Sequence, residues 1–202
     1  MRKIILEEGM ATDLQLQILD IPVEQLDFDG CFDYAYSVNV MEHVHDVEKA
    51  LSNVAKGLAA GACYRFTCPN YLFPYEPHFN IPTLFSKKLT ERILGWKIFR
   101  SESMPDPAGT WKSLNWINVI QVGRIIQRQP ELNLTFNRSM LVAALERIAT
   151  DSVFAERRSP LIRSLIILLV RLQAHKLFGL LPASLQPIMD CRIEKKSNSE
   201  IR

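Results

Sequence analysis

The sequence predicts an α/β fold with a mostly parallel sheet, flanking helices and a C-terminal helical region. Residues 34–40 are mostly aromatic, small or β-branched and carry no charge, which is typical of a central strand covered on both faces. Apolar residues then recur at helical spacing from Val47 to Leu58, and residues 62–68 form a second strand. Strands that are separated by a helix in this way indicate a parallel sheet.

The remaining elements are predicted from local signals. Asp46 can accept hydrogen bonds from the free N–H groups of the first helix, and Gly61 ends that segment. Breaks are expected at Pro130 and Pro160. The other predicted elements are a strand at 14–19, a helix at 116–127, a strand at 131–136, a helix at 140–148 and a helix at 160–181.

The composition indicates a globular protein in a reducing compartment. Of the 202 residues, 48% are hydrophobic and 23% are charged, which is close to the globular average and argues against extensive disorder. The apolar run at 4–6 is too short for the core of a secretory signal. The four cysteines, Cys31, Cys63, Cys68 and Cys191, have neither metal-binding spacing nor that of a disulfide framework. We therefore expect a cytoplasmic protein.

Several motifs occur in an ordered series between residues 2 and 70. They are Asp20-Ile21, Phe32-Asp33, Met41-Glu42-His43-Val44, the amphipathic helix, Leu58-Ala59-Ala60-Gly61 and Pro69-Asn70. Their order and spacing resemble the second half of a class I S-adenosylmethionine-dependent methyltransferase of the type 11/12 kind. A set of ordered motifs is more specific than any single motif. The resemblance implies a Rossmann-like sheet, and S-adenosylmethionine as the cofactor.

The resemblance also implies roles for individual residues. Asp20 and Ile21 correspond to the adenine-binding turn, where a carboxylate accepts from the adenine amino group. Val38 and Asn39 would line the cofactor with their backbone, and His43 would lie close to it. From the residues alone, Asp20 can equally be an ordinary turn residue at a strand end.

One part of the family pattern is absent from the sequence. Members of the family begin with a strand, a glycine-rich turn and a helix, and a second strand then ends in the acid that binds ribose. The first glycine here is Gly9, and residues 2–8 already resemble the helix after that second strand. Glycine permits the close backbone approach that such a turn needs. We therefore expect a truncated Rossmann-like core at residues 1–70 and impaired cofactor binding.

Residues 71–130 are predicted to form a substrate cap, because proline and aromatic residues are frequent after Asn70. Within this region, Glu76 and His78 are the candidate catalytic residues, since an acid and a histidine two residues apart can orient or deprotonate an acceptor hydroxyl or amine. The alternative is a structural loop in which both side chains bind the backbone.

Other kinds of site are less well supported. Glu42 can cap or buttress the helix that begins near Asp46 instead of serving a site. A zinc site would have to combine His43, His45, Cys63 and Cys68, but their spacing matches no zinc motif, so no metal is expected. Ser-His-Asp catalysis is not indicated, because no serine lies in a glycine-flanked elbow.

Residues 131–202 are predicted to contain the remaining strand and the C-terminal helical region, and this part of the chain is basic. Residues 157–202 hold nine Lys and Arg against three Asp and Glu, and the helix at 160–181 interleaves basic with apolar residues. Such a helix either packs on the domain or lies on an anionic membrane surface. Nucleic acid is not expected as a partner, because no aromatic and basic stripe is present.

The resemblance thus implies methyl transfer from S-adenosylmethionine to a small molecule, a lipid or a sugar precursor. The competing hypothesis is a non-catalytic module that binds a partner or a membrane surface. A sheet that lacks its first strands would also expose an edge, and an exposed edge promotes self-association.

Overall fold

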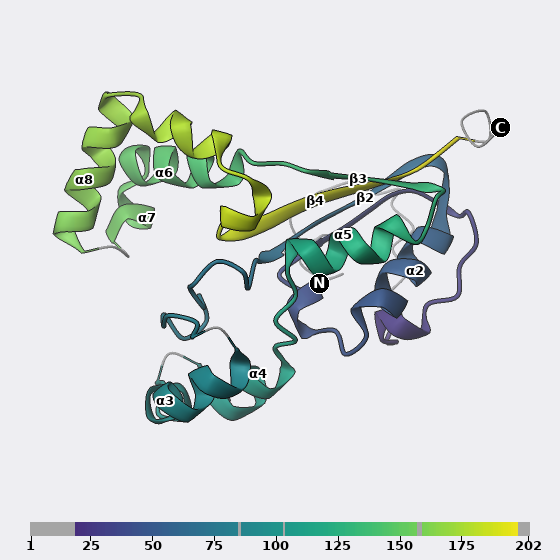
Figure 1. Cartoon of the computed structure of the whole chain (residues 1–202), viewed down its shortest axis with the longest axis horizontal. Coiled ribbons are helices and arrows are strands. Elements are labelled where there is room, and N and C mark those ends of the chain that lie inside the picture. Colours follow the sequence, from purple (N-terminus) through teal and green to yellow (C-terminus); the bar gives the residue numbers. More distant parts are fainter. Residues whose placement is uncertain (1–18, 85, 103, 157–158, 198–202) are drawn as a thin grey trace, which may run out of the picture.

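The computed structural model describes residues 19–84, 86–102, 104–156 and 159–197, and one four-stranded sheet organises them (Figure 1). The strands are β1 (Phe32–Val38), β2 (Leu58–Pro69), β3 (Leu132–Phe136) and β4 (Ile188–Lys195), in the order β1-β2-β4-β3. Strand β1 is parallel to β2, whereas β4 lies antiparallel between β2 and β3. The α/β class and the flanking helices are confirmed, but the described sheet is mixed instead of mostly parallel.

The difference comes from β4, which the sequence analysis did not predict. Its residues Met189, Cys191 and Ile193 are buried and alternate with Asp190 and Arg192 on the other face. The predicted C-terminal helical region is present between β3 and β4, but the chain then returns to the sheet, which was not predicted. The predicted strand at 14–19 lies almost entirely outside the described residues.

Helices α2 (Val47–Gly57) and α5 (Val119–Gln127) lie on one face of the sheet (Figure 1). Alternate residues of β2, including Tyr64, Phe66 and Cys68, are buried on that face, because side chains of a strand point to opposite faces in turn. The carboxylate of Asp46 accepts a hydrogen bond of 2.9 Å from the Lys49 N–H group, which confirms the predicted N-cap of α2.

The helices between β3 and β4 form a separate group at one end of the molecule (Figure 1). They are α6 (Met140–Thr150), α7 (Ser152–Glu156), α8 (Pro160–Arg171), η3 (Ala174–Leu180) and η4 (Ala183–Leu185). The predicted helix at 160–181 is thus divided between α8 and η3, with Gln173 in a left-handed conformation (φ 58°) between them. A small hydrophobic cluster, separate from the main core, holds part of this group together. Its buried residues are Ile148, Ala155 and Ile166.

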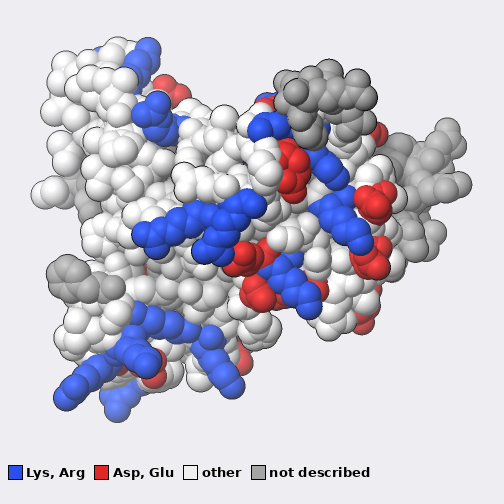
Figure 2. All heavy atoms as spheres, turned by 45° about the vertical axis from the view of Figure 1, so that its right-hand side comes forward, with Lys and Arg blue, Asp and Glu red and all other residues white. Residues whose placement is uncertain are grey.

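Helices α3 (Lys87–Phe99) and α4 (Pro107–Ser113) lie together at the bottom of Figure 1. Basic side chains gather over this part of the molecule, whereas the α6–α8 end shows a broad surface with few charged groups (Figure 2). No helix in the described part of the chain has both the length and the apolar character that crossing a membrane requires.

Candidate functional site

The chain turns sharply where β1 ends. Asn39 adopts a left-handed conformation (φ 53°), and its N–H group donates a hydrogen bond of 2.8 Å to the carbonyl oxygen of Thr67 on β2. Asparagine tolerates this conformation better than most residues do. The turn leads directly into the short helix η2 (Met41–His43), so Glu42 and His43 lie just past the carboxyl end of β1. In α/β sheets, this end of a strand is where ligands bind.

Asn115 holds η2 in place. Its Nδ2 group donates hydrogen bonds of 2.8 Å to the carbonyl oxygens of Met41 and Val44, and its N–H group donates one of 2.8 Å to the carbonyl oxygen of Glu42. Three hydrogen bonds from one residue fix the turn against the segment between α4 and α5. The sequence analysis missed Asn115, because no local pattern connects it with residues that lie more than 70 positions earlier.

The side chain of Glu42 is completely buried, and neither carboxylate oxygen has a hydrogen-bond partner among the described residues. Burial raises the pKa of this carboxyl group above its ordinary value, because water no longer stabilises the charge. The interpretation of Glu42 as a helix cap is wrong. Asp46 caps α2, and Glu24 Oε1 accepts the N–H group of His45 at 2.8 Å.

Glu76 and His78 form a close pair in the loop after β2. Glu76 is completely buried, and its Oε1 lies 2.6 Å from Nδ1 of His78. Its Oε2 accepts a hydrogen bond of 2.7 Å from the N–H group of Phe79, and the Tyr71 hydroxyl donates one of 3.3 Å to Oε1. The hydrogen bond to Glu76 raises the pKa of His78, although partial burial opposes this effect.

His43 lies next to this pair. The ring centroids of His43 and His78 are 5.5 Å apart, and Nδ1 of His43 lies 2.8 Å from Oγ of Ser113. Burial lowers the pKa of His43, and the charge of His78 lowers it further. One ligand atom from each of Glu42, His43 and His78 lies within 4.8 Å of the other two. We call Glu42, His43, Glu76 and His78 the strand-end cluster.

The other predicted site residues lie outside this cluster. Asp20 and Ile21 are exposed in the segment before the short helix η1 (Val23–Gln25). Val38 is 60% exposed at the end of β1. The alternative zinc set is not brought together, because Cys63 and Cys68 lie on opposite faces of β2. Among the described residues, the candidate metal-binding group is instead Glu42, His43 and His78.

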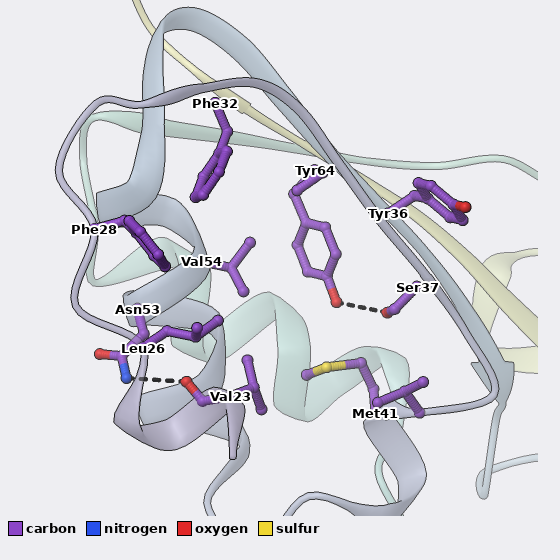
Figure 3. Close-up of a pocket in the computed structure, with 12 residues that line it drawn as sticks. Val23, Leu26, Phe28, Phe32, Tyr36, Ser37, Met41, Asn53, Val54 and Tyr64 are labelled. Atoms are coloured by element: carbon purple, nitrogen blue, oxygen red, sulfur yellow. Dashed lines mark hydrogen bonds between the residues drawn. The ribbon is translucent and has the colours of Figure 1, made fainter. Parts of the chain in front are cut away.

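An apolar cavity of about 290 Å³ lies beside β1 (Figure 3). A hydrogen bond of 2.7 Å between the hydroxyl groups of Ser37 and Tyr64 lies in its wall, and Nδ2 of Asn53 donates one of 3.1 Å to the carbonyl oxygen of Val23. This cavity was not among the sites predicted from the sequence. Its lining residues are Val23, Leu26, Phe28, Phe32, Ala35, Tyr36, Ser37, Val40, Met41, Asn53, Val54 and Tyr64.

Comparison with known families identifies the first part of the chain. Residues 2–65 match the model of a family described as a methyltransferase domain. This match agrees with the resemblance that the ordered motifs indicated. Within the described residues it includes η1, β1, η2, α2 and β2 as far as Arg65. Asp20, Ile21, Val38, Asn39 and His43 all lie inside the matched segment, whereas Glu76 and His78 follow it.

Two curated proteins of Mycobacterium tuberculosis, from the strains CDC 1551/Oshkosh and ATCC 25618/H37Rv, are each 50% identical to the chain over 165 residues. Both are described as uncharacterised. The alignment covers 82% of this chain and 56% of each relative, so the chain spans little more than half of their length.

Solved structures resemble the chain at low sequence identity. The YcgJ protein of Bacillus subtilis has a TM-score of 0.49 at 15% identity, over 98% of this chain and 77% of that one. Phosphoethanolamine N-methyltransferase 2 of Haemonchus contortus, solved with S-adenosyl-L-methionine, has a TM-score of 0.40 at 13% identity, over 88% of this chain and 36% of that one.

Proposed function

We propose that the protein transfers a methyl group from S-adenosylmethionine to a small-molecule acceptor. The observation that carries this proposal is the pair of buried Glu76 and half-buried His78, which lies beside His43 past the end of β1. That strand and His43 belong to the segment that matches the methyltransferase domain.

On the acceptor side, the pair has the arrangement of a general base and its orienting acid. Glu76, when ionised, can only accept, so its hydrogen bond to Nδ1 places a proton on Nδ1 of His78. Nε2 of His78 then carries the lone pair and accepts a proton from the acceptor hydroxyl or amine. The negative charge of Glu76 stabilises the imidazolium that forms. When bound, S-adenosylmethionine supplies the electrophilic methyl group.

On the cofactor side, the proposal assigns the roles that the family resemblance implied. The carboxylate of Asp20 would accept from the adenine amino group, Ile21 would pack on the ring, and the turn at Val38 and Asn39 would line the cofactor. The N–H group of Asn39 already donates to Thr67, so the contacts left to this residue are those of its carbonyl and side chain. His43 would lie between this region and the acceptor.

The acceptor is expected to carry a hydroxyl or an amine, because these groups need the base that His78 provides. A soluble small molecule, a lipid headgroup and a sugar precursor all satisfy this requirement. Assays with one acceptor from each class would separate them.

The cofactor proposal is tested by ligand-observed NMR of the full chain with S-adenosylmethionine. We expect binding that S-adenosylhomocysteine displaces. Asp20→Ala should weaken it, whereas Asp29→Ala, a change at another exposed aspartate, should not. A signal that S-adenosylhomocysteine does not displace, or equal binding by both variants, would overturn the cofactor assignment.

The acceptor proposal is tested by methyl transfer with saturating cofactor. His78→Gln should lower the rate by at least about 100-fold, the usual contribution of a general base. His45→Gln, a change at an exposed histidine outside the cluster, should leave it unchanged. A His78→Gln protein with the full rate would show that His78 is not the base.

A further inference from the structure

We infer that Glu42, His43 and His78 bind one divalent transition-metal ion of the zinc type. The three side chains come from two segments, η2 and the loop after β2, and their ligand atoms lie within 4.8 Å of one another. This inference rests on the apposition of these side chains and not on methyl transfer. A metal ion bound to Nε2 of His78 would occupy the lone pair that the general-base proposal uses, so zinc binding would replace that role of His78.

The buried carboxylate of Glu42 is the first argument. Buried polar side chains nearly always have a hydrogen-bond partner, and an unpaired buried charge is costly. Both oxygens of Glu42 lack a partner among the described residues, although the side chain is completely inaccessible. A cation between Glu42 and the two histidines would satisfy this carboxylate.

The hydrogen bonds of the two histidines are the second argument. Ser113 Oγ donates its only hydrogen to the carbonyl oxygen of Thr110 at 2.8 Å, so it must accept from Nδ1–H of His43. Nδ1 of His78 likewise donates to Glu76. Both rings therefore carry their proton on Nδ1 and keep the lone pair of Nε2 free. A histidine that ligates a metal almost always donates its other nitrogen to such an outer partner.

The donor set determines the kind of ion. Two imidazole nitrogens and one carboxylate oxygen favour Zn²⁺, Fe²⁺ or Co²⁺ over Mg²⁺ or Ca²⁺, which prefer oxygen ligands. Three protein ligands leave a coordination position open, as in catalytic zinc sites. The His78 side chain is 24% exposed, which gives the ion a route to the cluster, whereas Glu42 is completely buried.

Zinc titration of the full chain, freed of metal by a chelator, tests the inference without S-adenosylmethionine. Calorimetry should show one zinc ion per chain and no comparable binding of Mg²⁺. Glu42→Gln, which keeps the shape of the side chain and has no hydrogen bond to lose, should weaken zinc binding at least about tenfold. Ser113→Ala removes the outer partner of His43, together with the hydrogen bond from Ser113 to Thr110, and should weaken zinc binding about 10- to 100-fold. The control His45→Gln should bind zinc as the wild type does.

The four cysteines are the main competitors for zinc, so Co²⁺ serves as the spectroscopic probe. Nitrogen and oxygen ligands give no thiolate charge-transfer absorption, and its absence is the expected result. The inference is overturned if this absorption appears, if the wild type binds no zinc, or if Glu42→Gln binds zinc as the wild type does. Circular dichroism of each variant would confirm that the fold is retained. Because no cofactor is present, failure of this test leaves the methyl-transfer proposal untouched.

Discussion

Arg65 on β2 and Asp190 on β4 form two parallel hydrogen bonds, Nε to Oδ1 at 2.8 Å and Nη2 to Oδ2 at 2.7 Å. The Asp190 side chain is 1% exposed and that of Arg65 is 46% exposed. Nδ2 of Asn137, just after β3, donates a third hydrogen bond of 2.8 Å to Asp190. The buried carboxylate of Asp190 on β4 thus joins β4 to β2 and to the residue after β3. Of the three residues involved, only Arg65 lies in the segment that matches the methyltransferase domain.

Replacing Arg65 with alanine should destabilise the protein by about 2 to 3 kcal/mol. The change leaves the Asp190 carboxylate buried without its main partner, and the cost falls below that of a fully buried pair because Arg65 is half exposed. Chemical denaturation of the full chain measures the change in the free energy of unfolding. The matched control is Arg192→Ala, which removes an exposed pair with Glu194 and should cost less than about 1 kcal/mol. Equal losses in both variants would contradict the role given to Asp190.

Asn115→Ala should loosen η2 and thereby the strand-end cluster. The variant loses two side-chain hydrogen bonds to carbonyl groups of the turn, which together contribute about 1 to 3 kcal/mol. Thermal unfolding measures the loss of stability, and zinc titration should show weaker binding, because η2 positions Glu42 and His43. Asn53→Ala removes one such bond, to the carbonyl of Val23, and should leave zinc affinity intact. Unchanged zinc binding in Asn115→Ala would mean that the cluster does not depend on this turn.

The β1 edge of the described sheet should promote self-association. Tyr36 is 73% exposed and Val38 is 60% exposed, and β1 pairs with only one neighbour among the described strands. Light scattering coupled to chromatography should show a mass that increases with protein concentration. Tyr36→Lys should reduce that mass, whereas Ile120→Lys, an exposed position on α5, should not. A sharp monomeric peak at every concentration, with cooperative thermal unfolding, would refute this expectation.

The α8–η3 segment is expected to bind anionic vesicles. Leu161, Leu172 and Leu180 are 79%, 67% and 74% exposed, so much of its apolar surface is not used for packing. Apolar burial and roughly 1 kcal/mol for each basic residue near the surface would contribute to binding, which should weaken as salt rises. Arg163→Glu/Arg171→Glu should therefore sediment less with vesicles than the wild type does. The matched control is Lys88→Glu/Arg92→Glu, which makes the same change in net charge on α3, outside the α8–η3 segment. Equal, salt-independent sedimentation of all three proteins would show that the α8–η3 segment does not bind anionic membranes through its basic residues.

The sequence by itself determined the local elements of the first half of the chain. The uncharged run at 34–40, the amphipathic spacing after Asp46 and the ordered motifs each depend on residues close together, so β1, α2 and β2 could be predicted from them. The predicted central position of the first strand was wrong, because β1 lies at an edge of the described sheet and most of its residues are exposed. The resemblance to a methyltransferase followed from the same motifs, and residues 2–65 match the model of a methyltransferase domain. Glu76 and His78 could be proposed as a pair for the same reason, because they lie two residues apart and their apposition is nearly local.

Only the tertiary structure decided which distant residues meet. Strand β4 was not predicted, although its apolar and charged residues alternate as in a half-buried strand. The end of the chain was interpreted as helical, and β4 gains its burial from β2 and β3 on either side. From the sequence alone, Glu42 could be interpreted as a helix cap. No local sequence pattern marks Asn115 or Ser113 as part of the site. Burial and hydrogen-bond partners depend on chain segments far apart in sequence, and local pattern cannot encode them. The position of His78 beside His43, and of both beside the unpaired Glu42, is a property of the folded chain alone.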